Sequence, residues 1–170
     1  LGELEENLGI KVTEAYAGIS GEAVRCGSSS YYVYVSGQDG EIQDEDVTKL
    51  HEGMNILPPP DGYCILDRLP QKYVIDSREE TMKPVGRFGR RLESTFNVVL
   101  GNRNSVDRLT RAMNRLQVST KKLFSNAQAS AAAVLTEDEK EIGAAVVDIG
   151  AGVTDICIWY DNIMRYVSVL

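Results

Sequence analysis

The sequence lacks the basic charge of nucleic-acid binders, the apolar runs of membrane proteins and the cysteine spacing of zinc or redox sites. Its formal net charge is −7, so it offers no basic footprint for general nucleic-acid binding. No apolar run approaches the roughly 20 residues that span a bilayer, and no charged segment followed by an apolar one opens the chain as a signal peptide would. The three cysteines lie far apart and follow no zinc or redox spacing, which favours a reducing cytoplasm.

Residues for nucleophilic or histidine-based catalysis are also scarce. His51 is the single histidine, and no cysteine, second histidine or carboxylate cluster stands at ligand spacing around it. A surface or packing role is therefore favoured for His51. No Gly-x-Ser-x-Gly sequence is present, so a nucleophilic triad has no support.

The shares of hydrophobic and charged residues are those of an ordinary globular protein. Of 170 residues, 43% are hydrophobic and 25% are charged, which suffices for one domain or two small ones with a real core. The chain starts at Leu1 in a helix-like segment and stops in the strand-like residues 167–170. We therefore expect it to be a piece of a longer protein.

Apolar patterning predicts a mixed α/β chain. Strands are expected over residues 11–19, 31–35, 63–69, 73–75, 92–100 and 118–124, and helices over 1–8, 44–54, 104–117 and 125–135. Pro70 suggests an edge or a bulge in its strand, and Asp44 is the expected N-cap of its helix. Residues 77–91 are expected to form a basic loop. Residues 136–139 carry a capping-box pattern but are expected to form a solvated turn.

The most informative segment is the glycine hairpin, residues 146–158, which reads as two buried strands joined by a glycine-rich turn. Gly150 and Gly152 are expected to adopt backbone angles that side chains disfavour. Successive N–H groups would then converge on phosphate oxygens. Asp148, at the end of the first strand, is placed to hold a hydrated Mg²⁺. An ordinary β-hairpin is the alternative interpretation.

A second candidate site is the loop of residues 83–91. Arg87, Phe88, Arg90 and Arg91 combine arginine with an aromatic residue, a composition favoured at protein interfaces. The alternative is a solvated connection. The arginines at 103, 108, 111 and 115 are expected to form a solvated helix face.

Three further segments resemble those of the FtsA family, the actin-like cell-division proteins of bacteria. Residues 69–76, LPQKYVID, are similar to a strand pattern of that family. Residues 83–93, KPVGRFGRRLE, are similar to its Asn-Pro-Val-Gly segment, and residues 129–143 to the helix and turn before its phosphate hairpin. The resemblance covers most of the chain, from about Ile10 to Leu170.

The resemblance implies an α/β fold: a fragment of an actin-like (ribonuclease H-like) fold that carries an inserted β-rich 1C subdomain of the SHS2 type. Residues 1–21 would be part of subdomain 1A, residues 22–100 subdomain 1C, and residues 101–143 the return to 1A. Residues 144–170 would open subdomain 2A with its phosphate-binding hairpin.

The resemblance also implies site residues and cofactors. ATP phosphates would lie on Gly150, Ala151, Gly152, Val153 and Thr154, with Mg²⁺ held through water by Asp148 and Asp155. Val153 stands where many relatives have threonine. Asn126 lies near the position at which actin-like relatives carry the residue that orients the attacking water. An amide can position water but cannot act as a base, so the resemblance implies at most a weak ATPase. Because the other nucleotide motifs lie outside the chain, we expect it to bind ATP and Mg²⁺ weakly or not at all by itself.

The implied function is that of a nucleotide-dependent scaffold rather than a metabolic enzyme. Such a protein polymerises into filaments at the inner membrane, tethers the FtsZ ring and recruits later division proteins through 1C. Contact with FtsZ and with the membrane would use regions outside this chain, the latter a C-terminal tail. The parent would lie in the bacterial cytoplasm, peripheral on the cytoplasmic face of the inner membrane at the division site, and would bind no nucleic acid.

Three other functions stay open. A pilus-assembly scaffold of the PilM type shares the 1C-type insert. A sugar-kinase-type phosphotransferase would need an aspartate base that this chain does not supply. An Hsp70-type ATPase would need a peptide-binding β domain.

Overall fold

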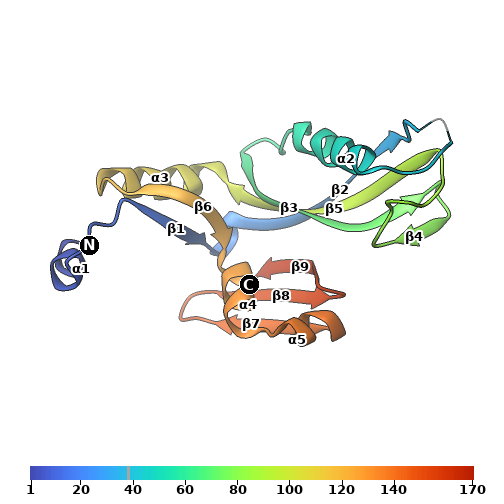
Figure 1. Cartoon of the computed structure of the whole chain (residues 1–170). Coiled ribbons are helices and arrows are strands. Elements are labelled where there is room, and N and C mark those ends of the chain that lie inside the picture. The colour runs from blue at the N-terminus through green and yellow to red at the C-terminus, as the bar shows by residue number, and fades with distance from the viewer. Residues whose placement is uncertain (38) are drawn as a thin grey trace.

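The computed structural model describes residues 1–37 and 39–170 and is a mixed α/β structure, as predicted. Within these residues the chain forms three sheets (Figure 1). The elements run in the order α1 (Gly2–Leu8), β1 (Glu14–Ile19), a 3-10 turn (Gly21–Ala23), β2 (Val24–Tyr34), α2 (Asp44–Ile56), β3 (Tyr63–Ile75), β4 (Glu79–Thr81), β5 (Arg91–Asn102), α3 (Arg103–Arg115), β6 (Ser119–Ser125), α4 (Asn126–Val134), α5 (Glu137–Ile142), β7 (Ala144–Ile149), β8 (Thr154–Tyr160) and β9 (Ile163–Val169).

The largest sheet is antiparallel, with strand order β2-β5-β3-β4. β5 lies inside this sheet and buries Leu92, Phe96 and Val99. The β3–β5 register shifts at two places, one of them between Pro70 and Tyr73. A proline cannot donate to the ladder, so the chain bulges there. Of the edge and the bulge predicted at Pro70, the structure shows the bulge, since β3 lies between β5 and β4.

α2 covers one face of this sheet (Figure 1). Leu50 of α2 is fully buried in a cluster with Ile42, Tyr73 and Leu92. The N-cap is Gln43, not Asp44 as expected, because the Asp46 carboxylate accepts the Gln43 backbone N–H at 3.0 Å and completes a capping box.

The opposite face of the four-stranded sheet packs on the antiparallel sheet β7-β8-β9. One apolar cluster joins Val99 of β5 to Cys157 of β8, Val167 of β9 and Ala131 of α4. Burial raises the pKa of the Cys157 thiol to about 11, so it packs as a neutral group. The two sheets therefore share one core.

The third sheet pairs β1 with β6 in parallel. Parallel strands need a long crossover, and here residues 20–118 supply it. The crossover leaves at the carboxyl ends of β1 and β6, where α4 also begins, and returns through α3 at the opposite ends of the two strands (Figure 1).

Three sequence expectations about elements were wrong. Residues 137–142 form α5 rather than a solvated turn, because Thr136 and Glu139 complete their capping box. The expected basic loop contains β4, which pairs with the end of β3. β2 begins at Val24 rather than near Tyr31, because its glycine and serines, weak strand formers, pair along β5.

No helix among the described residues is long and apolar enough to cross a membrane.

Candidate functional site

The candidate phosphate site lies where β1 and β6 end. These strands are parallel, so Ile19 and Ser125 stand side by side at their carboxyl ends. Ligands of open α/β sheets bind at such ends. Three segments converge here: the turn after β1, the first residues of α4, and the tip of the glycine hairpin.

The predicted hairpin forms, with β7 and β8 antiparallel and Asp148 directly opposite Asp155. The expectation of two buried strands is wrong for β7, which has no buried residue and exposes Val147 and Ile149. The hairpin tip is closed by the Gly150 N–H, which donates to the Val153 carbonyl at 3.0 Å. The expected backbone angles are wrong, since neither Gly150 nor Gly152 has a positive φ. What distinguishes Gly152 is the open space around it, because a Cβ built on this residue would meet no atom within 4 Å.

Asp155 and Asp148 differ in their surroundings. Asp155 is buried, and both of its carboxylate oxygens accept the Ser20 hydroxyl at 2.7 Å. It therefore ties β8 to the end of β1. Asp148 is exposed and accepts the Ser130 hydroxyl of α4 at 2.6 Å. Asp148 is thus the carboxylate with an open side towards solvent.

Asn126 and Val153 also face the turn after β1. The Oδ1 atom of Asn126 occupies the space that a Cβ on Gly18 would need. A Cβ on Gly21, whose φ is +77°, would lie 3.6 Å from Cγ1 of Val153. A side chain at position 18 would displace the Asn126 side chain, and the left-handed backbone at position 21 favours glycine.

The residues at this site could bind a magnesium–nucleotide only if the protein holds the metal indirectly, through water. Among the described residues, no group of three or more histidine, cysteine, aspartate or glutamate side chains could hold a metal ion. Asp148 is the exposed aspartate of the hairpin, with one oxygen bound by Ser130, so a Mg²⁺ here would be held through water and by the phosphates of the ligand itself. The open space at Gly152 fits a phosphate group that approaches the backbone.

The second candidate site, residues 83–91, is an ordered segment. The Arg87 carbonyl accepts the Ile42 N–H at 2.8 Å, and the Asp76 carboxylate accepts the N–H groups of Arg90 and Arg91 at 2.9 Å. Phe88 is 65% exposed. The segment therefore presents its aromatic side chain on a fixed backbone.

The arginines of this segment are not equally available. Arg87 pairs with Glu79, and Arg91 lies 2.8 Å from Glu93 and stacks over the Tyr32 ring. Exposed pairs of this kind contribute little to stability, but they neutralise charge. Arg90 and Phe88 are left as the groups most open to a partner, and both line one hollow with Tyr34.

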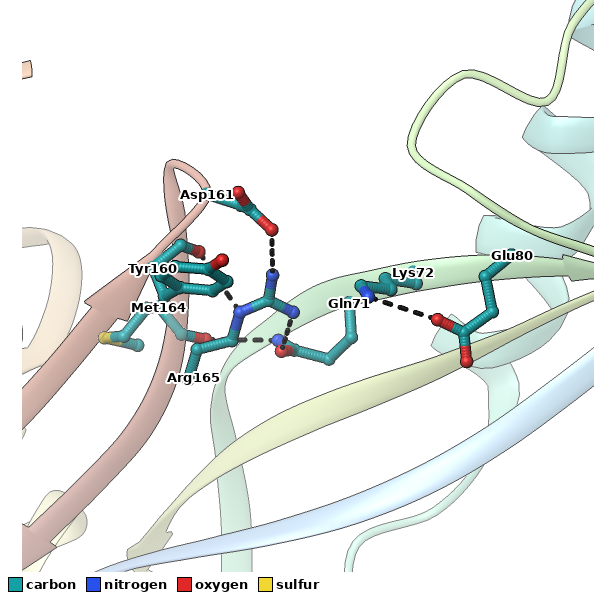
Figure 2. A network of polar contacts seen from close by, with 7 residues as sticks. All are labelled: Gln71, Lys72, Glu80, Tyr160, Asp161, Met164 and Arg165. Atoms are coloured by element: carbon teal, nitrogen blue, oxygen red, sulfur yellow. Dashed lines mark hydrogen bonds and ion pairs between the residues drawn. The ribbon is translucent and has the colours of Figure 1, made fainter. Parts of the chain in front are cut away.

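A polar junction links the four-stranded sheet to β9 (Figure 2). Gln71 of β3 donates through Nε2 to the Met164 carbonyl at 3.1 Å, and the Arg165 guanidinium donates to Gln71 Oε1 at 3.1 Å. Asn97 of β5 donates to the Arg165 carbonyl at 2.6 Å. The β8–β9 register shifts near these residues, so the junction satisfies carbonyls that the irregular ladder leaves free.

The family model and the curated relatives agree on the family. A family model described as "SHS2 domain inserted in FTSA" matches residues 21–100. The cell division protein FtsA of Pseudomonas aeruginosa is 32% identical over 170 residues, which is 100% of this chain and 40% of that protein. FtsA of Neisseria meningitidis serogroup B is 32% identical over 160 residues, 94% of this chain and 38% of that protein. The chain belongs to the FtsA family.

The FtsA of Bacillus subtilis is 28% identical over 160 residues, 94% of this chain and 36% of that protein. The chain thus spans about two fifths of the length of these relatives. Among solved structures, the "PilM-PilN type IV pilus biogenesis complex" contains a chain with 18% identity and a TM-score of 0.60, over 99% of this chain and 45% of that one. That likeness concerns the fold, and it is consistent with a fragment of an actin-like fold.

The structure adds site residues that the sequence did not reveal. Ser20 and Ser130 bind the two aspartates, Gly18 makes room for the Asn126 side chain, and Gly21 supplies the left-handed turn beside Val153. A serine–glycine pair after a strand is an ordinary turn signal, so nothing local distinguished Ser20 and Gly21. The roles predicted for the hairpin, Asn126 and the 83–91 segment remain predictions.

Proposed function

We propose that the chain is part of an ATP-binding scaffold of bacterial cell division, in which residues 148–155 bind ATP phosphates with Mg²⁺. The observation that supports this best is the convergence of the hairpin, the turn after β1 and the α4 N-terminus at the carboxyl ends of two parallel strands. Asp155 binds Ser20, Val153 lies beside Gly21, and Asn126 lies against Gly18. A helix N-terminus adds a favourable field for an anion.

In this proposal Asp148 orients the water shell of Mg²⁺, while Asp155 holds the hairpin against β1 through Ser20. Asn126 positions a water molecule without accepting a proton, since an amide has no basic group at neutral pH. Turnover should therefore be slow, and the nucleotide would act mainly as an assembly switch.

The proposal extends to the assembly and partners of the whole protein in cell division. We propose that it polymerises on the cytoplasmic face of the inner membrane at the division site, with FtsZ and the membrane contacted by regions beyond this chain. Residues 22–100 would recruit later division proteins, with Phe88 and Arg90 as the contact groups. Residues 1–21 and 101–143 would belong to subdomain 1A, and residues 144–170 to subdomain 2A.

The test is ATP binding and turnover by the full-length FtsA-type protein that carries this segment, on lipid vesicles. We expect tight binding, slow turnover and lipid-dependent filaments. Asp148→Ala should weaken Mg²⁺-dependent ATP binding by about tenfold, or about 1.4 kcal/mol. Asp138→Ala, which removes an exposed carboxylate on α5, is the matched control and should bind ATP normally. Equal Mg²⁺-dependent affinity in all three proteins would contradict the phosphate site.

A pilus-assembly scaffold is the second candidate, because of the structural likeness to the PilM–PilN complex. The greater sequence identity to division proteins favours division. Filaments that bind vesicles but fail to recruit FtsZ would favour the pilus function.

A further inference from the structure

The outer edge of β2 is an unpaired β-strand within the region that matches the SHS2 family model. β2 runs for 11 residues and pairs along its whole length with β5 on one side. In the described part of the chain, no strand pairs with its other side. None of residues 25–34 is buried, although β5 beside them buries Leu92, Phe96 and Val99.

The opposite edge of the same sheet is protected and β2 is not. There β4 is only three residues long and carries Glu79 and Glu80, the short, charged form by which natural sheets avoid pairing with another chain. β2 has no proline, and Arg25 is its one charged residue. An edge of this kind is a template for strand addition.

α2 does not cover the middle of this edge. Gly27 and Ser29 line a cavity of about 220 Å³ beside Met54 and Leu57, at the end of the helix. A Cβ on Gly27 would meet nothing within 4 Å. The side chains of residues 27–30, one glycine and three serines, are small, so they leave room for a second strand to lie beside their backbone.

The two ends of β2 differ in shape: one end carries protruding tyrosines and the other borders a hollow. Tyr32 and Tyr34 protrude at the C-terminal end, 47% and 71% exposed, and their rings pack edge to face. At the N-terminal end, Val24 and Cys26 border a hollow that also includes Tyr166 of β9. Tyrosine suits such a place, because its ring is apolar and its hydroxyl finds polar partners.

We propose that the outer edge of β2 pairs antiparallel with β2 of a second copy of this chain, around a two-fold axis at Ser29. This register places Gly27 opposite Tyr31 and Ser28 opposite Ser30. It also brings Tyr34 of each copy to the Val24 end of the other. Small and neutral residues at the centre let two chains of like net charge meet there, and an aromatic residue opposite glycine is a favourable pair in sheets.

This contact is independent of nucleotide and does not rest on the proposed ATP site. It is isologous, so it closes into a dimer rather than extending a filament. A single strand pair is a small interface, and we expect association in the micromolar range.

The experiment measures self-association of the 170-residue chain by sedimentation velocity, at moderate salt, from micromolar to millimolar concentration. Ser28→Lys with Ser30→Lys places lysines opposite each other twice and should weaken the dimer by about tenfold or more. Ser28→Lys with Ser30→Glu creates two attractive pairs in the same register and should restore it. Tyr34→Ala should also weaken the dimer, because tyrosine side chains often dominate interfaces.

The matched control is Thr48→Lys with Asn114→Lys, which adds the same charge on exposed helix positions. It should associate like the parent chain, and thermal melting should show that every variant is folded. A parent chain that stays monomeric at millimolar concentration overturns the proposal. So does association that is equal in the lysine–lysine and lysine–glutamate variants, since the register would then be wrong.

Discussion

At the scale of single residues, glycine has two different functions in this site. A Cβ at Gly18 would collide with the Asn126 side chain, and the left-handed backbone at Gly21 disfavours other residues. Gly152 has neither constraint, because its φ is not positive and the space over it is open. A constraint from folding therefore explains the first two glycines, whereas a ligand would explain the third.

Gly152→Trp tests this difference. The indole would extend into the open space that we assign to phosphate, so ATP affinity of the full-length protein should fall by at least about tenfold. Its melting temperature should change little, since nothing within 4 Å opposes the new Cβ. Isothermal titration calorimetry and thermal melting measure the two effects. Unchanged ATP affinity in a folded variant would show that Gly152 faces no ligand.

At the scale of elements, α2 is held to its sheet by buried polar groups as well as apolar ones. The Asp46 carboxylate is fully buried and accepts three hydrogen bonds, from the Ser36 N–H, the Ser36 hydroxyl and the Gln43 N–H. Burial works against its charge, but these bonds prevail and lower its pKa. His51, one turn further along, packs between Tyr73 and Phe96. Of the surface and packing roles predicted for His51, the structure shows packing.

His51 should make the stability of the chain depend on pH. Burial lowers its pKa below the ordinary 6.5, so the unfolded state takes up a proton at a higher pH than the folded state. The free energy of unfolding should therefore decrease as pH falls below 6.5. His51→Gln keeps a group that can hydrogen-bond the Tyr73 hydroxyl but cannot titrate.

Urea denaturation at a series of pH values checks this prediction. The decrease between neutral and mildly acid pH should be smaller in His51→Gln than in the parent chain. Parallel curves for the two proteins would mean that other groups cause the acid sensitivity. The effect of Asp46 is separable, because its lowered pKa removes stability only at pH below its ordinary 3.8.

At the scale of the whole molecule, the junction in Figure 2 joins the four-stranded sheet to the sheet that carries the glycine hairpin. Gln71 and Asn97 come from the first sheet, and they bind the Met164 and Arg165 carbonyls of β9 in the second. β9 pairs with β8, which begins at the hairpin tip. The two parts should therefore unfold together.

The double substitution Asn97→Ala with Gln71→Ala should uncouple the unfolding of β9 from that of the four-stranded sheet. Each lost bond leaves a part-buried carbonyl without its partner and should cost about 1–3 kcal/mol. Hydrogen exchange at the β9 amides should accelerate more than exchange at β5. Lys72→Ala is the control, because it removes only the ion pair with Glu80 inside one sheet, worth less than about 1 kcal/mol. Equal acceleration in β5 and β9 would mean general destabilisation instead.

The sequence by itself determined the fold class, the family, most helices and strands, and the form of the hairpin. These follow from local patterns: the apolar period of α2, the β-branched runs of β7 and β8, and the bulge at Pro70. It failed at α5 and β4, where capping and pairing partners outweighed a polar composition. Only the tertiary structure brought Ser20 to Asp155 and Ser130 to Asp148, because these pairs are 135 and 18 residues apart. The bare edge of β2 is likewise decided by strand order, which depends on long-range pairing that no local pattern encodes.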